Sequence, residues 1–179
     1  MKALDYVAGY ASGTVEAVRR LVETEQLGAY LQKKYPEPHA CTSDRLLFAY
    51  ADGIRCESMR HAPPLAKVLY DGKIRSVNQA LGLHTCARRV QGGKIRTRSE
   101  IRIAGVFRRA PEALLRMIVV HELAHLKEKA HDRAFYRLCE HMEPRYHELE
   151  FDARLFLIHL EHFGALYPET PAADSATVI

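Results

Sequence analysis

The sequence lacks the features that mark membrane, secreted and repeat proteins. No stretch approaches the roughly 18 to 20 consecutive apolar residues of a membrane-spanning helix. The N-terminus has no apolar segment of signal-peptide length, and no internal repeat is present. We therefore expect a cytoplasmic protein that does not enter a membrane.

Cysteine is also scarce, and no two cysteines form a Cys-x-x-Cys pair. The four cysteines are scattered over the chain, at Cys41, Cys56, Cys86 and Cys139. Such spacing favours free thiols in a reducing compartment over disulfides or a second metal site. The missing pair also counts against a zinc ribbon.

What is present is typical of one globular domain. The 179 residues are 47% hydrophobic and 27% charged, and the net charge is a mild +4. A chain of this length is long enough to bury a substantial core.

The most informative feature is the run His-Glu-Leu-Ala-His at residues 121–125. Histidines four residues apart lie on one helix face, so His121 and His125 can bind the same metal ion. Glu122 lies beside that face, where it can take a proton from a metal-bound water. The apolar residues 117–120 lead directly into the motif and indicate a buried helix. We predict a zinc site, although other divalent metals accept the same ligands.

His131 is the favoured third ligand. In an unbroken helix it would stand about 9 Å along the axis from His125 and more than 90° around it. The chain must therefore leave the helix around residues 128–130, and Asp132 is well placed to cap a new helix. Metzincin proteases have the same histidine spacing with a glycine in the turn, but here Glu128 takes that position.

A carboxylate from the following helices is the alternative third ligand, as in gluzincin proteases. The available carboxylates are Glu143, Glu148, Glu150 and Asp152.

Helices are expected at both ends of the chain and strands in the middle. Apolar spacing, capping residues and prolines predict helices over residues 14–25, 27–35, 44–59, 111–127, 132–143 and 147–163. Residues 82–91 and 94–103 flank Gly92-Gly93 and are typical of a hairpin.

The second arm of this hairpin is strongly basic on one face. Eight basic residues against one acidic residue lie between residues 88 and 109. Strict alternation places Lys94, Arg96, Arg98, Glu100 and Arg102 on the same face. Such a face could bind an anionic substrate, or it could simply keep an edge strand soluble.

The sequence resembles the YgjP-like metallopeptidase family, which is related to the WLM and SprT-like zincins. The resemblance covers about residues 65–160. It rests on His121–His131 followed by Phe135, and on Gly82-Leu-His-Thr, Val90-Gln-Gly-Gly-Lys, Glu100-Ile-Arg-Ile and Met142-Glu-Pro-Arg-Tyr. It implies a zincin-type α+β fold with His121, His125 and His131 as metal ligands and Glu122 as the general base.

We therefore expect one zincin-like α+β domain in three parts. Residues 1–64 form an N-terminal helical segment, residues 65–163 form the metallopeptidase domain, and residues 164–179 form a loose tail.

The leading functional hypothesis is a zinc-dependent hydrolase of metallopeptidase type. Water activated by Glu122 would attack a peptide bond, and the strand over residues 94–103 would hold the polypeptide by β-augmentation. Candidate substrate-binding residues are Arg96, Arg98, Arg102 and Tyr146.

Three other hypotheses remain open. A nucleoside triphosphate pyrophosphohydrolase could use the same metal site and the basic face, although no Gly-rich phosphate loop or Walker motif is present. A SprT-like protease that associates with nucleic acid has weaker support, because the net charge is small. A purely structural zinc domain is least favoured, since it would normally use four protein ligands.

Overall fold

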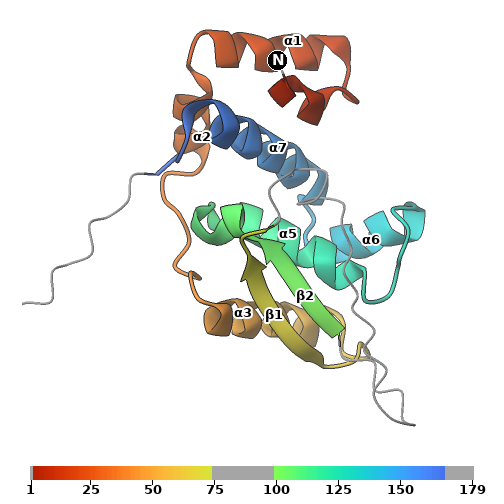
Figure 1. The fold of residues 1–179 in the computed structure, drawn as a ribbon. Helices are drawn as coiled ribbons and strands as arrows, with labels where there is room; N and C mark the ends of the chain where they lie inside the picture. The colour runs from red at the N-terminus through yellow and green to blue at the C-terminus, as the bar shows by residue number, and fades with distance from the viewer. Residues whose placement is uncertain (1, 74–98, 168–179) are drawn as a thin grey trace, which may run out of the picture.

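The computed structural model describes residues 2–73 and 99–167, which form helices around a small parallel sheet (Figure 1). The elements in chain order are η1 (Lys2–Val7), α1 (Ser12–Glu23), α2 (Leu27–Lys34), α3 (Asp44–Ser58), β1 (Leu65–Asp71), β2 (Ser99–Ala104), η2 (Gly105–Arg109), α5 (Glu112–Ala124), α6 (Arg133–Met142) and α7 (Tyr146–Phe163). The predicted α+β class is confirmed.

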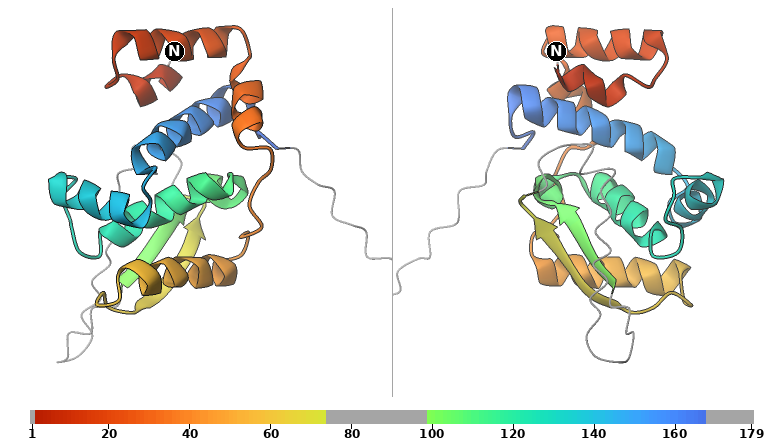
Figure 2. Two further views of the ribbon diagram at one scale, coloured as in Figure 1. Left: turned by 180° about the vertical axis from the view of Figure 1, so that it is seen from behind. Right: turned by 45° about the vertical axis from the view of Figure 1, so that its right-hand side comes forward.

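Helix α5 lies at the centre of the molecule. It contacts β2 and α3 on one side and α7 on the other, and the views of Figure 2 show it between these layers. Nearly every residue from Leu114 to Ala124 is buried. A helix that is apolar on all sides is stable only inside a core, and this explains its place.

The sheet consists of β1 and β2, which pair in parallel with Val68 opposite Ile101 and Tyr70 opposite Ile103. Along β2, Ile101 and Ile103 are buried whereas Arg102 is exposed, as the alternation predicts. The sequence analysis predicted no strand at β1. The Gly-Gly turn and the first arm of the predicted hairpin lie outside the described residues.

Two of the predicted helix starts are fixed by side-chain caps. Ser43 accepts the backbone N–H of Leu46 at the start of α3, and Asp132 accepts those of Ala134 and Phe135 at the start of α6. Each cap pairs an N–H that the first turn leaves unsatisfied. Helix α5, in contrast, ends at Ala124, three residues before the predicted end.

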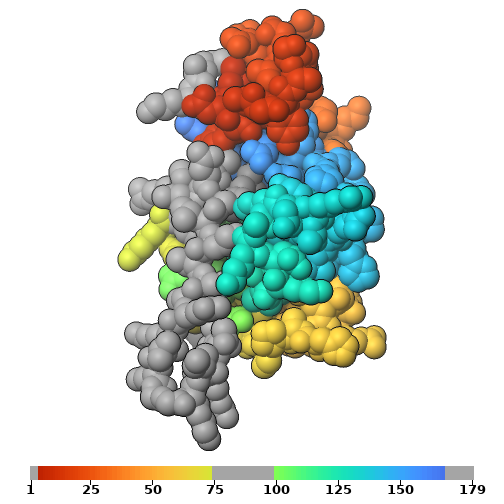
Figure 3. All heavy atoms as spheres, turned by 90° about the vertical axis from the view of Figure 1, so that its right-hand side faces the viewer, coloured from red at the N-terminus to blue at the C-terminus, as the bar shows by residue number. Residues whose placement is uncertain are grey.

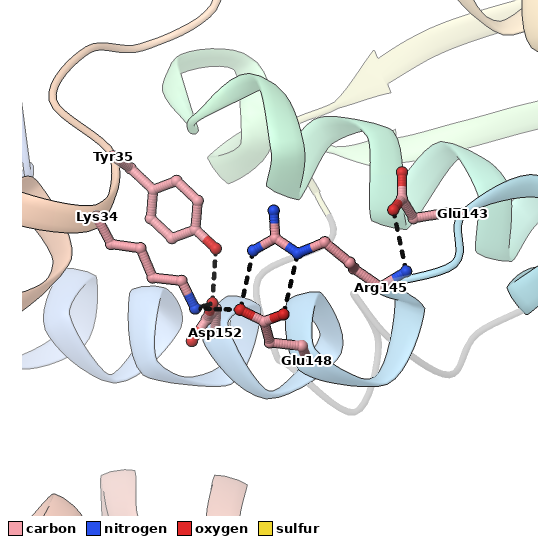
Figure 4. Close-up of polar contacts among 6 residues, drawn as sticks. All are labelled: Lys34, Tyr35, Glu143, Arg145, Glu148 and Asp152. Carbon is pink, nitrogen blue, oxygen red and sulfur yellow. Dashed lines mark hydrogen bonds and ion pairs between the residues drawn. The ribbon is translucent and has the colours of Figure 1, made fainter.

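A cluster of charged and polar side chains joins α2 to α7, and we call it the α2–α7 ion cluster (Figure 4). Asp152 is 2% exposed and accepts hydrogen bonds from Lys34 Nζ at 2.5 Å and Tyr35 Oη at 2.6 Å. Lys34 also pairs with Glu148 at 2.6 Å. Arg145 binds Glu148 through Nε and Nη2. These contacts tie the N-terminal helices to the start of α7.

Helices α2 and α7 pack closely at Gly28. A Cβ atom on Gly28 would stand 2.8 Å from Cε1 of His159, which is buried in α7. Any larger residue at position 28 would have to displace this imidazole.

Membrane-spanning helices are not found in the described part of the chain. Over residues 2–73 and 99–167, no helix combines the length and the apolar character needed to cross a bilayer.

Candidate metal centre

Three histidines from one helix and the turn after it meet at a single point. His121 lies in the last turn of α5, His125 caps that helix, and His131 lies just before α6. Their Nε2 atoms are 3.2 Å apart for His121 and His125, 3.1 Å for His125 and His131, and 3.2 Å for His121 and His131. The three atoms form an almost equilateral triangle.

The size of this triangle fits a bound metal ion. Zinc bonds to imidazole nitrogen at about 2.0–2.1 Å, so two ligands of a tetrahedral site stand about 3.3 Å apart. The observed separations of 3.1–3.2 Å are close to that value. Within the described ranges, this is the group of His, Cys, Asp and Glu side chains that is arranged to hold a metal.

The ring of His125 is oriented by the backbone of its own turn. Its Nδ1 lies 2.8 Å from the carbonyl oxygen of Glu128. Because a carbonyl only accepts, Nδ1 carries the proton and the neutral ring presents a lone pair at Nε2. That lone pair faces the other two histidines, as a metal ligand requires.

The turn that brings His131 back to the helix needs no glycine. The backbone N–H groups of Leu126, Lys127 and Glu128 donate to the last carbonyls of α5 at 2.9–3.0 Å and close the turn. No described residue of this turn has a positive φ. Glu128 is therefore accommodated where metzincins have glycine.

Phe135 forms an apolar wall behind all three imidazoles. Its ring centroid lies 5.0, 4.3 and 4.7 Å from those of His121, His125 and His131, and its side chain is fully buried. The sequence analysis gave Phe135 no role, although its place four residues after His131 puts it on the first turn of α6. The wall fixes the rings from behind and keeps water away from that side.

Glu122 is half-buried between the two helical histidines. Burial raises its pKa to about 8. A divalent cation at the histidines would lower this pKa again, because an opposite charge nearby favours the carboxylate. A carboxyl group in such surroundings suits proton transfer near neutral pH.

The predicted substrate-binding residues lie in different surroundings. Arg102 is exposed on β2 and pairs with Asp71 at 2.9 Å and Glu100 at 2.7 Å. Tyr146 is fully buried, and its hydroxyl lies 2.6 Å from His121 Nδ1. Arg96 and Arg98 fall outside the described residues.

The carboxylates weighed as alternative ligands are bound to cations elsewhere. Glu143 pairs with Arg116 at 2.8 Å, and Glu150 pairs with Arg154 at 2.6 Å. Glu148 and Asp152 belong to the α2–α7 ion cluster.

The turn with His131 and the helix after it reach the surface, whereas α5 is covered. His131 is exposed, but His121 and His125 are each only 4% exposed. In the space-filling view, the teal surface belongs to this part of the chain (Figure 3).

An α+β fold whose buried central helix ends in this histidine cluster is that of a metal-dependent hydrolase. Comparisons with known proteins define it more closely. Residues 90–152 match the family described as YgjP-like, metallopeptidase domain. The chain is also 53% identical over 160 residues to UTP pyrophosphatase of Escherichia coli (strain K12), a match that covers 89% of this chain and 96% of that protein. The chain belongs to the YgjP-like family, as its sequence predicted. No solved structure matches it.

Proposed function

We propose that this protein hydrolyses a nucleoside triphosphate to a nucleoside monophosphate and pyrophosphate, with uridine triphosphate as the first substrate to test. The observation that carries the proposal is the 53% identity, over almost the full length of both chains, to a protein named UTP pyrophosphatase. The sequence analysis ranked peptide hydrolysis first, and this relative reverses the order.

His121, His125 and His131 are the proposed metal ligands, with zinc as the proposed metal. All three are neutral when they bind a cation, so a divalent ion would keep its full charge of +2. A metal site with a carboxylate ligand would keep less of the positive charge of its ion. The undiminished charge would attract the strongly anionic triphosphate. When bound, the metal would act as a Lewis acid and lower the pKa of a coordinated water.

Glu122 is the proposed general base. It stands one residue after His121 and three before His125, so its carboxylate shares their end of the helix. The carboxylate takes a proton from the attacking water as the water oxygen bonds to the α-phosphorus. The bond from that phosphorus to the bridging oxygen breaks, and Glu122 returns the proton to the pyrophosphate that leaves.

Peptide hydrolysis is the second candidate. It is supported by the description of the family as a metallopeptidase domain and by the position of the motif on a buried helix next to β2. The proposed substrate strand, residues 94–103, is described only from Ser99 onwards, and there it pairs with β1 on one edge. A nucleic-acid-associated protease stays a weaker hypothesis.

The test offers both substrates to the same metal-loaded protein. Uridine triphosphate and an unfolded polypeptide are incubated separately, and pyrophosphate and new amino termini are measured. Glu122→Gln should keep the metal and lower the turnover rate by about 10²–10⁴-fold. Glu140→Gln is the matched control, because Glu140 is exposed on α6 and should leave turnover unchanged. Glu122-dependent peptide cleavage without pyrophosphate release would overturn the proposal in favour of the peptidase.

A further inference from the structure

We infer that Tyr146 is a positioning residue of the metal centre, whose hydroxyl fixes the tautomer and the orientation of His121. The inference rests on the metal site of the proposed function and not on its substrate. It also gives Tyr146 a different role from the substrate contact that the sequence suggested.

The contact between the two side chains is short and enclosed. The Tyr146 hydroxyl lies 2.6 Å from Nδ1 of His121, and the two ring planes differ by only 18°. Tyr146 is fully buried and His121 is 4% exposed. Water therefore has little access to this pair, and buried polar groups of this kind are normally hydrogen-bonded to protein partners.

The direction of this hydrogen bond decides whether His121 can bind a metal. A neutral imidazole carries one proton, and a ring that binds a metal through Nε2 must carry it on Nδ1. Nδ1 then donates to the tyrosine oxygen. If the tyrosine donated instead, the ring proton would sit on Nε2, only 3.2 Å from the Nε2 atoms of His125 and His131. That tautomer would block the site.

Tyr146 can act as the acceptor because a tyrosine hydroxyl has acceptor lone pairs as well as its own proton. The hydrogen bond therefore runs from Nδ1 of His121 to the tyrosine oxygen. It leaves the Nε2 lone pair of His121 facing the cluster.

The place of Tyr146 is set by the same helix that carries His121. Arg116 of α5 binds Glu143 at 2.8 Å and the carbonyl of Met142 at 2.9 Å, which pins the turn between α6 and α7. The N–H of Tyr146 then donates to the carbonyl of Glu143 at 2.9 Å. Helix α5 thus positions both the imidazole and its hydrogen-bond partner.

The Tyr146 hydroxyl holds Nδ1 of His121 in the same way as the Glu128 carbonyl holds Nδ1 of His125. Both contacts hold the nitrogen that points away from the metal. A backbone carbonyl cannot be removed by substitution, but a tyrosine hydroxyl can.

The experiment measures the zinc dissociation constant by competition with a chromophoric chelator, without any substrate. Removing a hydrogen-bond partner of a metal ligand typically costs 10–100-fold in affinity. We expect a loss in that range for Tyr146→Phe. Tyr136→Phe is the matched control, because that ring lies 6.4 Å from His131, about as far as Tyr146 lies from His121. It should change affinity by less than about 3-fold, below the range expected for a lost ligand partner.

A second measurement reports the tautomer of His121 directly, and its first part uses only the wild-type protein. Long-range ¹H–¹⁵N spectra of the metal-loaded wild-type protein should show the proton of His121 on Nδ1. In metal-loaded Tyr146→Phe, the Nδ1 proton signal should move and exchange faster. Wild-type His121 bound through Nδ1, or a Tyr146→Phe variant that binds zinc as tightly as Tyr136→Phe, would overturn the inference.

The same data separate this inference from the proposed function. Tight zinc binding by the wild type without pyrophosphate release would reject the substrate and leave the role of Tyr146 standing. Equal affinity of both tyrosine variants would reject the role of Tyr146 alone.

Discussion

The histidine cluster and the α2–α7 ion cluster are both built from polar side chains at or near helix ends, but their charges are balanced in different ways. In the ion cluster, each acid meets a cation from the same chain, and Asp152 also accepts from Tyr35. In the histidine cluster, three nitrogens of the same kind face one another at 3.1–3.2 Å. The first cluster needs nothing from outside, whereas the second is arranged to receive a cation.

This difference predicts which property each cluster controls. An ion pair within the chain stabilises the fold, and removing one partner of a buried pair is costly. A ligand set stabilises the fold only through the ligand it binds, by about 2.7 kcal/mol when the free metal is at 100 times its dissociation constant. Variants of the two clusters should therefore separate metal affinity from the stability of the metal-free protein.

The largest effect is expected for His125→Ala. Loss of this proposed ligand should weaken zinc binding by more than about 100-fold, the upper end of the range for indirect partners. A chelator should lower the melting temperature of the zinc-loaded wild type and should have no such effect on this variant. His162→Ala serves as the control, because His162 is exposed near the end of α7. Equal zinc affinity of the two variants would remove His125 from the ligand set.

The next largest effect is expected for Asp152→Asn. It removes the buried charge that faces Lys34 and should lower the free energy of unfolding of the metal-free protein by about 2 kcal/mol. The expected value lies below the 3–5 kcal/mol typical of a broken buried pair because Glu148 still faces Lys34. Urea unfolding measures the loss, and zinc affinity should stay constant.

Asp52→Asn is the matched control for that variant. Asp52 pairs with Arg55 at 2.7 Å, but its side chain is 34% exposed. A surface pair of this kind contributes about 0–1 kcal/mol. If both variants lost the same stability, the α2–α7 ion cluster would be no more important than an ordinary surface pair.

Arg116→Met should change both properties moderately, because Arg116 is bound to the turn that carries Tyr146. Loss of its hydrogen bonds to Glu143 and Met142 should cost about 1–2 kcal/mol at this partly exposed site. Zinc affinity should fall by less than in Tyr146→Phe, since the hydroxyl is displaced and not removed. Arg137→Met, an exposed position on α6, is the control. A change in stability with no change in affinity would show that the turn does not act on the metal centre.

The smallest effect concerns acid stability. Arg145 first, and then Lys34, hold the pKa of Glu148 at about 2, below its ordinary value of 4.5. Because the folded state has the lower pKa, the contribution of Glu148 is complete above pH 4.5 and is lost as the pH falls towards 2. Melting temperatures of the metal-free protein should fall less steeply over this interval in Glu148→Gln. Identical slopes would contradict the role of this carboxylate, and high salt should reduce the difference.

Features that depend on neighbouring residues could be predicted from the sequence, and features that depend on distant ones could not. Ser43 and Asp132 cap their helices through N–H groups two or three residues away. Strand β1 was missed because its partner β2 lies about thirty residues further along the chain. The end of α5 was misplaced because the turn that follows is closed by hydrogen bonds to the same helix.

The features of the candidate site also separate into those that depend on neighbouring residues and those that depend on distant ones. The sequence predicts that His121 and His125 share a helix face, since this follows from helix geometry. It gives no sign that Phe135 lies behind all three imidazoles or that Tyr146 faces His121, because these contacts join separate helices. The proposed substrate was ranked first because of the name of a relative and not because of any motif.

The burial of α5 and the exposure of His131 have a consequence for kinetics. Amide hydrogens in a helix buried on nearly all sides exchange only when the whole protein unfolds, whereas an exposed turn opens at a much smaller free energy. We therefore expect the exposed turn over residues 126–131, with His131, to open more often than the buried helix end that carries His121. A metal ion would be exchanged through this local opening, at a rate set by the turn and independent of the lifetime of the folded protein.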